Sequence, residues 1–137
     1  MSGATNWFRG GLVAYQMAVK RRHLGVRAAS MFSEECAVEM ARGAAAMFTA
    51  DITVSTTGVV GDEPEDGVSP GTVIIATYVA RETRVHTYRF TGDANQICAL
   101  ARHQALEDLL AALQAPPRPH RARHLAALPS MLDDAVR

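Results

Sequence analysis

Three residues near the start of the chain carry side chains that suit acid–base chemistry, namely Thr5, Tyr15 and Lys20. Tyr15 closes an apolar run that begins at Gly11, and Lys20 lies in the helical stretch that follows it. A hydroxyl, a phenol and an amine therefore stand near the ends of one predicted strand. A lysine in a partly dry place beside a hydroxyl can act as a general base, because burial lowers its pKa towards neutrality.

The residues after Lys20 support a second interpretation. Arg21, Arg22 and His23 follow it directly. A basic run at the end of a helix is usually a solvated face that complements the helix dipole. Residue types and spacing alone leave both interpretations open.

Composition limits the classes of function. The formal net charge is +0 with a pI of about 7.0, which gives no electrostatic case for a nucleic-acid partner. The N-terminus lacks the features of a secretory signal, and no apolar run approaches the length of a membrane span. We therefore expect a cytoplasmic protein without a membrane partner.

The two cysteines, Cys36 and Cys98, lie far apart and outside any C-x-x-C spacing. The sequence therefore predicts neither a metal site nor a redox motif, and no cofactor. Both cysteines fall in predicted helices, where we expect them to be small buried apolar residues.

Hydrophobic periodicity predicts an α/β domain over residues 1–114. The expected strands are 8–15, 51–57, 72–80 and 84–90, and the expected helices are 16–24, 34–49 and 93–114. The continuous apolar run 72–80 indicates a central strand, and the mixed polarity of 84–90 indicates a strand nearer the edge. The last helix carries a predicted core-facing stripe that consists of Leu106, Leu109, Leu110 and Leu113.

Two segments lack such periodicity. Residues 62–70 are acidic and contain two prolines, so we expect an irregular loop. Residues 115–137 begin with a Pro/Arg/His-rich stretch. This composition is typical of a linker, and we expect the segment to be a linker followed by a solvated tail.

The phrase Trp-Phe-Arg-Gly-Gly-Leu-Val-Ala-Tyr at residues 7–15, then Lys20, then Leu-Gly-Val at 24–26, resembles the CinA C-terminal domain family of competence/damage-inducible proteins. Further matches follow in the same order along residues 3–113, at Phe32-Ser33-Glu34, Thr57-Gly58, Gly71-Thr72-Val73 and Phe90-Thr91-Gly92-Asp93. The resemblance implies a three-layer fold with helices on both faces of a sheet. It also implies a nicotinamide-nucleotide deamidase, because family members characterised as enzymes convert nicotinamide mononucleotide to nicotinate mononucleotide and ammonia, a step of pyridine nucleotide salvage.

The resemblance assigns catalytic roles to four residues. Thr5 stands where the family usually has a nucleophilic serine, and it keeps the oxygen while adding a methyl group. Lys20 matches the activating lysine and Tyr15 the family's tyrosine. Thr57 matches a threonine expected on the oxyanion side of the site.

The resemblance also suggests how a small nucleotide substrate is bound. Backbone amides at Gly58 would assist the oxyanion side. The family's last helix carries an arginine suited to a phosphate, but Cys98 occupies the matching position and Arg102 follows one turn later. Arg102 is therefore a weaker candidate for the phosphate contact, and the acidic residues of the loop 62–66 would repel a phosphate.

Family domains begin with a further helix and strand that this sequence does not show before residue 3. We expect a sheet that lacks this first strand, with an exposed edge that favours a homo-oligomer. The alternative to an amidohydrolase is a truncated, non-catalytic relative that serves as a binding or assembly module.

Overall fold

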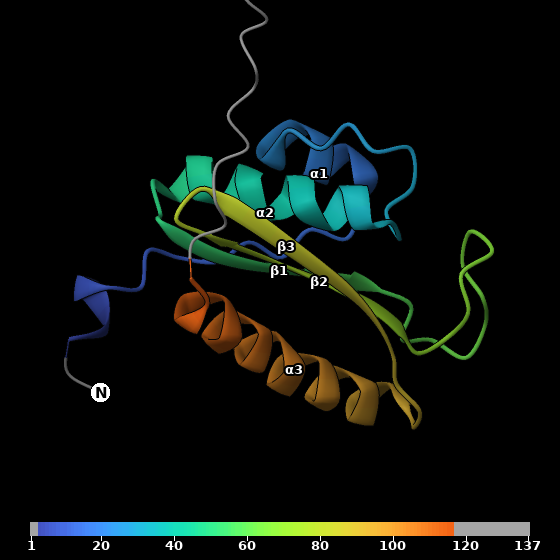
Figure 1. Ribbon diagram of the computed structural model, residues 1–137. Helices are drawn as coiled ribbons and strands as arrows, with labels where there is room; N and C mark the ends of the chain where they lie inside the picture. Colours follow the sequence, from blue (N-terminus) through green and yellow to red (C-terminus); the bar gives the residue numbers. More distant parts are fainter. Residues whose placement is uncertain (1–2, 117–137) are drawn as a thin grey trace, which may run out of the picture.

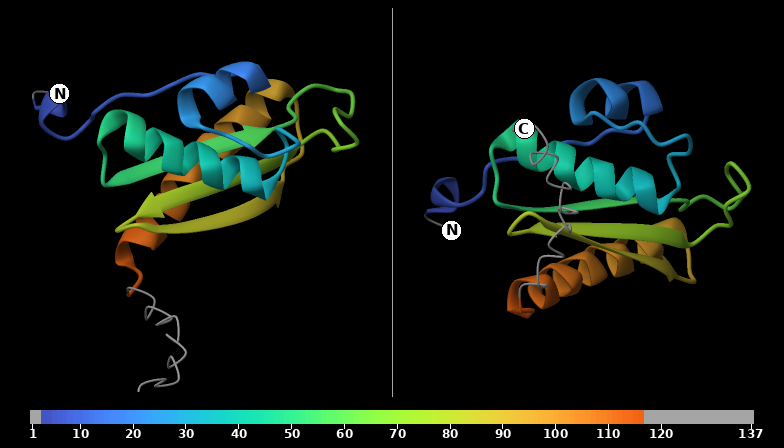
Figure 2. Two further views of the ribbon diagram at one scale, coloured as in Figure 1. Left: turned by 90° about the horizontal axis from the view of Figure 1, so that it is seen from above. Right: turned by 45° about the horizontal axis from the view of Figure 1, so that its top comes forward.

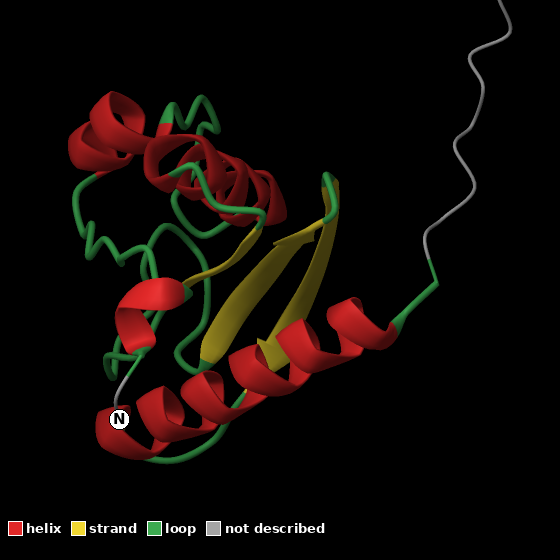
Figure 3. Ribbon diagram, turned by 90° about the vertical axis from the view of Figure 1, so that its left-hand side faces the viewer, coloured by secondary structure: helices red, strands yellow, loops and turns green. Residues whose placement is uncertain are grey.

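The computed structural model describes residues 3–116, which form a three-stranded sheet with helices on both faces (Figure 1). The elements in chain order are η1 (Ala4–Asn6), α1 (Met17–Leu24), α2 (Glu34–Phe48), β1 (Ile52–Gly58), β2 (Thr72–Val79), β3 (Glu82–Arg89) and α3 (Ala94–Gln114). Helix α2 covers one face of the sheet and α1 packs outside it, whereas α3 crosses the opposite face (Figures 1 and 3). The predicted α/β class and three-layer arrangement are confirmed. Of the predicted linker and tail at 115–137, residues 117–137 lie outside the described residues.

The sheet is antiparallel with the order β1-β2-β3. The central strand β2 buries five consecutive residues, 73–77, because helices cover both of its faces. Strand β3 forms one edge, as its mixed polarity predicted. A two-residue turn joins β2 to β3 through Ala80 and Arg81, both with positive φ (50° and 67°), which matches the twist that a tight hairpin needs.

Local capping explains where the long helices begin. The side chain of Ser33 accepts a hydrogen bond from the backbone N–H of Cys36 and starts α2. Asp93 starts α3 through a capping box, in which Asp93 and Gln96 each bond to the other's backbone N–H. Both helices therefore begin where their sequences predicted.

The acidic loop contains more order than expected. Glu65 and Val68 form an isolated antiparallel bridge around Asp66 and Gly67, which have φ values of 49° and 75°. Asp-Gly is a typical sequence for this two-residue turn. The loop 62–70 is thus a small hairpin tip and not wholly irregular.

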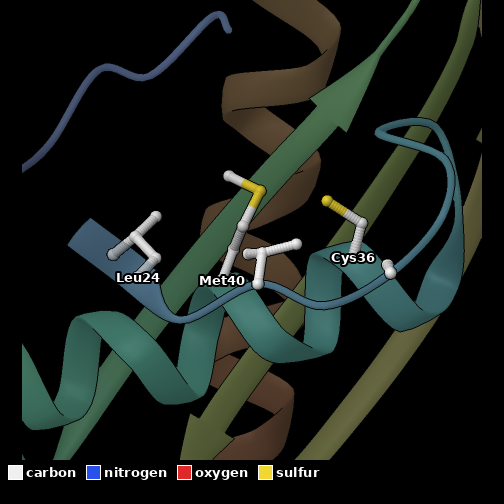
Figure 4. Close-up of a cluster of buried hydrophobic side chains, with 5 residues drawn as sticks. Leu24, Cys36 and Met40 are labelled. Atoms are coloured by element: carbon white, nitrogen blue, oxygen red, sulfur yellow. The ribbon is translucent and has the colours of Figure 1, made fainter. Parts of the chain in front are cut away.

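The core consists of three clusters, one for each contact between layers. The outer cluster joins α1 and the connection after it to α2, and it contains Leu24, Cys36 and Met40 (Figure 4). The other two clusters hold β2 against α2 and against α3. Small alanines at 37 and 41 allow α2 to lie close to β1 and β2.

The predicted strand 8–15 is wrong. These residues form no backbone ladder, although they run along the β1 side of the sheet in Figures 1 and 2. Val13 and Tyr15 are 82% and 85% exposed. A strand needs a paired neighbour, and the free edge of β1 does not bond to this segment.

The predicted leucine stripe of the last helix is also wrong as a core element. Leu106, Leu110 and Leu113 are exposed and Leu109 is half-buried, whereas the residues of α3 that are buried are Ile97, Ala105 and Ala112. Cys98 is exposed as well, whereas Cys36 is fully buried as expected. Helical spacing shows that the helix has an apolar face, but it does not show which face packs on the sheet. Here the face that carries the alanines does so.

No helix among residues 3–116 combines the length and the apolar character needed to span a bilayer.

Candidate active site

Lys20 is the single lysine of the sequence, in which all other Lys/Arg positions are arginine. It lies on α1 and is only 5% exposed. Its Nζ donates a hydrogen bond to Oγ1 of Thr57 at 3.2 Å, across 37 residues of sequence. The solvated-face interpretation of the basic run therefore fails for Lys20, while Arg21, Arg22 and His23 beside it are exposed.

Thr57 is the last of three hydroxyl residues that β1 directs at the layer of α2. Thr53 and Ser55 donate to the carbonyl oxygens of Ala41 and Ala37 of α2, at 2.7 and 2.6 Å. Thr57 donates to the carbonyl oxygen of Met31 at 2.7 Å. The Thr57 proton is therefore directed at Met31, and an oxygen lone pair remains for Lys20.

Burial lowers the pKa of Lys20 below its ordinary value of 10.5, and the nearby Cys36 opposes this shift without overcoming it. Burial likewise raises the pKa of the Cys36 thiol. Within residues 3–116 no carboxylate forms an ion pair with Lys20. An amine without a counter-ion in a dry place favours its neutral form, which is the form that accepts a proton.

The connection between α1 and α2 completes the surroundings of Lys20. The carboxylate of Glu39 accepts hydrogen bonds from the backbone N–H groups of Arg27 and Ala28, at 2.7 and 2.9 Å. This contact holds the connection that supplies the Met31 carbonyl. Sequence reasoning missed Met31, Cys36 and Glu39, because a backbone carbonyl, a buried thiol and a loop-holding acid have no motif of their own.

Gly58 follows Thr57 at the end of β1, where β2 approaches closely. A Cβ atom at this position would lie 2.9 Å from Cα of Val73 and would overlap the carbonyl oxygen of Thr72. Glycine is therefore needed for packing here. Its predicted role beside the oxyanion is still a prediction.

The structure does not bring Thr5 and Tyr15 to Lys20. Thr5 lies in η1, which projects beyond the end of the sheet where β1 begins, whereas Thr57 lies near the end of β1 (Figures 1 and 2). Both Thr5 and Tyr15 are exposed. Among the described residues neither side chain forms a hydrogen bond with Lys20 or Thr57.

Arg102 is also remote from Lys20. It is exposed on α3, on the face of the sheet opposite α1 and α2 (Figure 3). The structure thus assembles Lys20, Thr57 and Gly58 on one side of the molecule and leaves Thr5, Tyr15 and Arg102 apart from them.

Comparison with known proteins gives consistent matches along most of this chain. A family model described as the CinA C-terminal domain matches residues 1–113. A CinA-like protein of Thermotoga maritima is 40% identical over 115 residues, which are 78% of this chain and 28% of that protein. A competence-damage inducible protein of Bacillus velezensis is 38% identical over 102 residues, which are 71% of this chain and 24% of that protein. The chain therefore spans about a quarter of the length of these curated relatives.

Solved structures agree with the sequence matches. The crystal structure of a competence or damage-inducible protein from Enterobacter asburiae matches with a TM-score of 0.77 and 34% identity, covering 82% of this chain and 75% of that one. The structure of the competence/damage inducible protein CihA from Agrobacterium tumefaciens matches with a TM-score of 0.67 and 28% identity, covering 74% and 66%.

Proposed function

Since this chain belongs to the CinA C-terminal domain family, we propose that it is an amidohydrolase of the nicotinamide-nucleotide deamidase type. The proposed reaction adds water to the amide of nicotinamide mononucleotide. The C–N bond breaks, ammonia leaves, and nicotinate mononucleotide remains. No metal or other cofactor is required in this proposal.

One observation carries the proposal, namely the buried bond between Lys20 and Thr57. Lys20 in its neutral form accepts the proton of the attacking hydroxyl or water and returns it to the leaving nitrogen. An arginine at this position could not do so, because its guanidinium stays protonated. Every other Lys/Arg position of the sequence is arginine, so its one lysine stands at the position where an ionisable proton would be useful.

Thr57 acts in this proposal as a positioning residue. Its hydroxyl is fixed by Met31 and holds the Lys20 amine in one orientation. Thr5 is the nucleophile that the resemblance implies, and it reaches Lys20 only if residues 3–16 move from their described position or if a second copy supplies it. A water molecule activated by Lys20 is the direct alternative.

The single lysine permits a sharp test. Labelling the protein with [15N]lysine gives one side-chain Nζ signal, and its titration by NMR gives the pKa of Lys20 directly. We expect a pKa below 10.5, because the amine is buried without a carboxylate. Ammonia release from nicotinamide mononucleotide is then measured against pH, and the rate should rise with pH through the pKa found by NMR.

Lys20→Arg is the matched variant, since it keeps the positive charge but cannot release a proton. We expect the rate of ammonia release to fall about 100-fold or more, as is typical when a general base is removed. No release from a folded wild-type chain whose Lys20 pKa is lowered would refute the enzyme proposal. The binding or assembly module would then be the better description.

A further inference from the structure

Glu39 of α2 binds the connection between α1 and α2 through a single carboxylate oxygen. Its Oε2 accepts hydrogen bonds from the backbone N–H groups of Arg27 and Ala28, at 2.7 and 2.9 Å. Within residues 3–116 no lysine, arginine or histidine forms an ion pair with Glu39. The charge of Glu39 is therefore used on the backbone of the connection, and hydrogen bonds to a charged acceptor are stronger than neutral ones.

The connection is fixed on both sides of Met31. Before Met31, Ala28 is 1% exposed and packs in the outer cluster against α2. After Met31, the hydroxyl of Ser33 donates to the carbonyl oxygen of Ser30 at 2.9 Å, and Ser33 caps α2. The position of the Met31 carbonyl thus depends on contacts on either side of it, and Glu39 supplies one of them.

The Met31 carbonyl determines how the Thr57 hydroxyl can bond to Lys20. A hydroxyl has one proton, and Thr57 donates it to Met31 at 2.7 Å, so Thr57 acts as an acceptor towards Lys20. A neutral amine that donates to Thr57 keeps its lone pair for another proton. If the Met31 carbonyl moved away, the Thr57 hydroxyl could turn and donate to that lone pair, which the proposed reaction needs to be free.

We propose that Glu39 is a positioning residue for Lys20. It holds the connection so that the Met31 carbonyl keeps the Thr57 proton, across 26 residues of sequence, and the Lys20 lone pair stays available. This inference rests on the proposed function, in which neutral Lys20 is the general base. Glu39 acts through the backbone of the connection and then through Thr57.

A direct electrostatic role of Glu39 would have a different effect on Lys20. Burial, opposed by the nearby Cys36, lowers the pKa of Lys20. A carboxylate raises the pKa of a neighbouring amine by attraction, so removal of the charge alone would lower this pKa or leave it unchanged. A loosened connection would instead admit water to Lys20 and raise its pKa towards 10.5.

Two variants of Glu39 separate position from charge. Glu39→Gln keeps an oxygen that can accept both N–H bonds but removes the charge, whereas Glu39→Asp keeps the charge and withdraws the oxygens by about 1.5 Å. The pKa of Lys20 is measured on the Nζ signal of the chain labelled with [15N]lysine. We expect Glu39→Asp to raise it by about one pKa unit, and Glu39→Gln to change it by less than about 0.3.

Ammonia release from nicotinamide mononucleotide provides the second measurement. In Glu39→Asp we expect kcat to fall about 10-fold with KM changed less than about twofold, because the base is misplaced while the substrate contacts remain. Glu39→Gln should recover most of this loss. Glu35→Asp is the matched control, since it makes the same replacement at an exposed position one turn earlier on α2, and it should change neither measurement.

Glu39→Asp shortens a half-buried side chain by one methylene, so the fold should persist, which circular dichroism can verify. A Lys20 pKa that is unchanged or lowered in Glu39→Asp would overturn the proposal. An equal change in Glu39→Gln would also overturn it, because the charge would then be responsible. A wild type that releases no ammonia would count against the proposed function, while the pKa comparison would still decide the role of Glu39.

Discussion

Lys20 lies in a position that costs stability and that suits the chemistry proposed for it. The residue is 5% exposed, and within the described residues its amine has one hydrogen-bond partner, Thr57, and no carboxylate pairs with it. The folded state must either bury a charge or release a proton, and both cost free energy. Such a position is usually retained for function.

We therefore predict that Lys20→Met stabilises the protein at pH 7, by about 1 kcal/mol, while it abolishes ammonia release. Methionine fills similar space, and Thr57 keeps its bond to the Met31 carbonyl. Urea unfolding measures the free energy of unfolding of both proteins.

The pH dependence of this difference has a defined sign. The pKa of Lys20 is lower in the folded state than in the unfolded state, so the unfolded wild type binds more protons between these two values. Wild-type stability should rise with pH in that window, and the advantage of Lys20→Met should shrink as pH approaches 10.5. A variant that is less stable than the wild type at pH 7 would contradict this account.

At the scale of elements, the position of Lys20 depends on how α1 rests on α2. Gly43 of α2 lies directly beneath the end of α1. A Cβ atom at Gly43 would lie 2.7 Å from the carbonyl carbon of Leu24 and would overlap its oxygen. Glycine weakens a helix in isolation, so its presence inside α2 is explained by this close approach.

We predict that Gly43→Ala destabilises the protein by about 1–3 kcal/mol, although alanine favours helix formation. The backbone of α1 would have to shift, and Lys20 would move with it, so ammonia release should fall as well. Thermal unfolding and the activity assay provide the two measurements.

Gly61→Ala is the control for this variant, because a Cβ atom at Gly61 has no neighbour within 4 Å. Its effect on stability should stay within about 0.5 kcal/mol. If Gly43→Ala were as stable as the wild type, the contact between α1 and α2 would not be close in solution.

At the scale of the whole molecule, helices cover the two faces of the sheet to different extents. One side of the sheet is covered by two layers of helix, whereas Ile52 and Val54 of β1 and Leu106, Leu110 and Leu113 of α3 are exposed on the other side. An exposed apolar surface of this kind usually marks an interaction site.

The homo-oligomer expected from the sequence is still a prediction, and it implies that the midpoint of thermal unfolding depends on protein concentration. For a dimer of this size it should rise by about 2–3 °C for each tenfold increase in concentration, because dissociation accompanies unfolding. A midpoint that is independent of concentration in the wild type would argue for a monomer.

The sequence predicted most of the fold because its signals are local. Ser33 and Asp93 mark helix starts, and the apolar run at 72–80 identified the central strand. The prediction failed for residues 8–15, since β propensity cannot show whether a partner strand is present. It failed for the leucine stripe because periodicity identifies an apolar face without naming what covers it.

The candidate site was only partly predictable. Motif order along the chain selected Lys20, Thr57 and Gly58, and the structure brings these three together. The same motifs selected Thr5, Tyr15 and Arg102, which the structure leaves elsewhere, and their roles are still predictions.

By itself, the sequence determined the family, the α/β class and the residues able to exchange a proton, because residue types and short spacings encode these directly. Only the tertiary structure decided that Lys20 is buried, that the Thr57 hydroxyl is its partner, and that Leu106, Leu110 and Leu113 face solvent. Those properties depend on contacts between residues far apart in the chain, and the packing of α1 on α2 and of α3 on the sheet sets them.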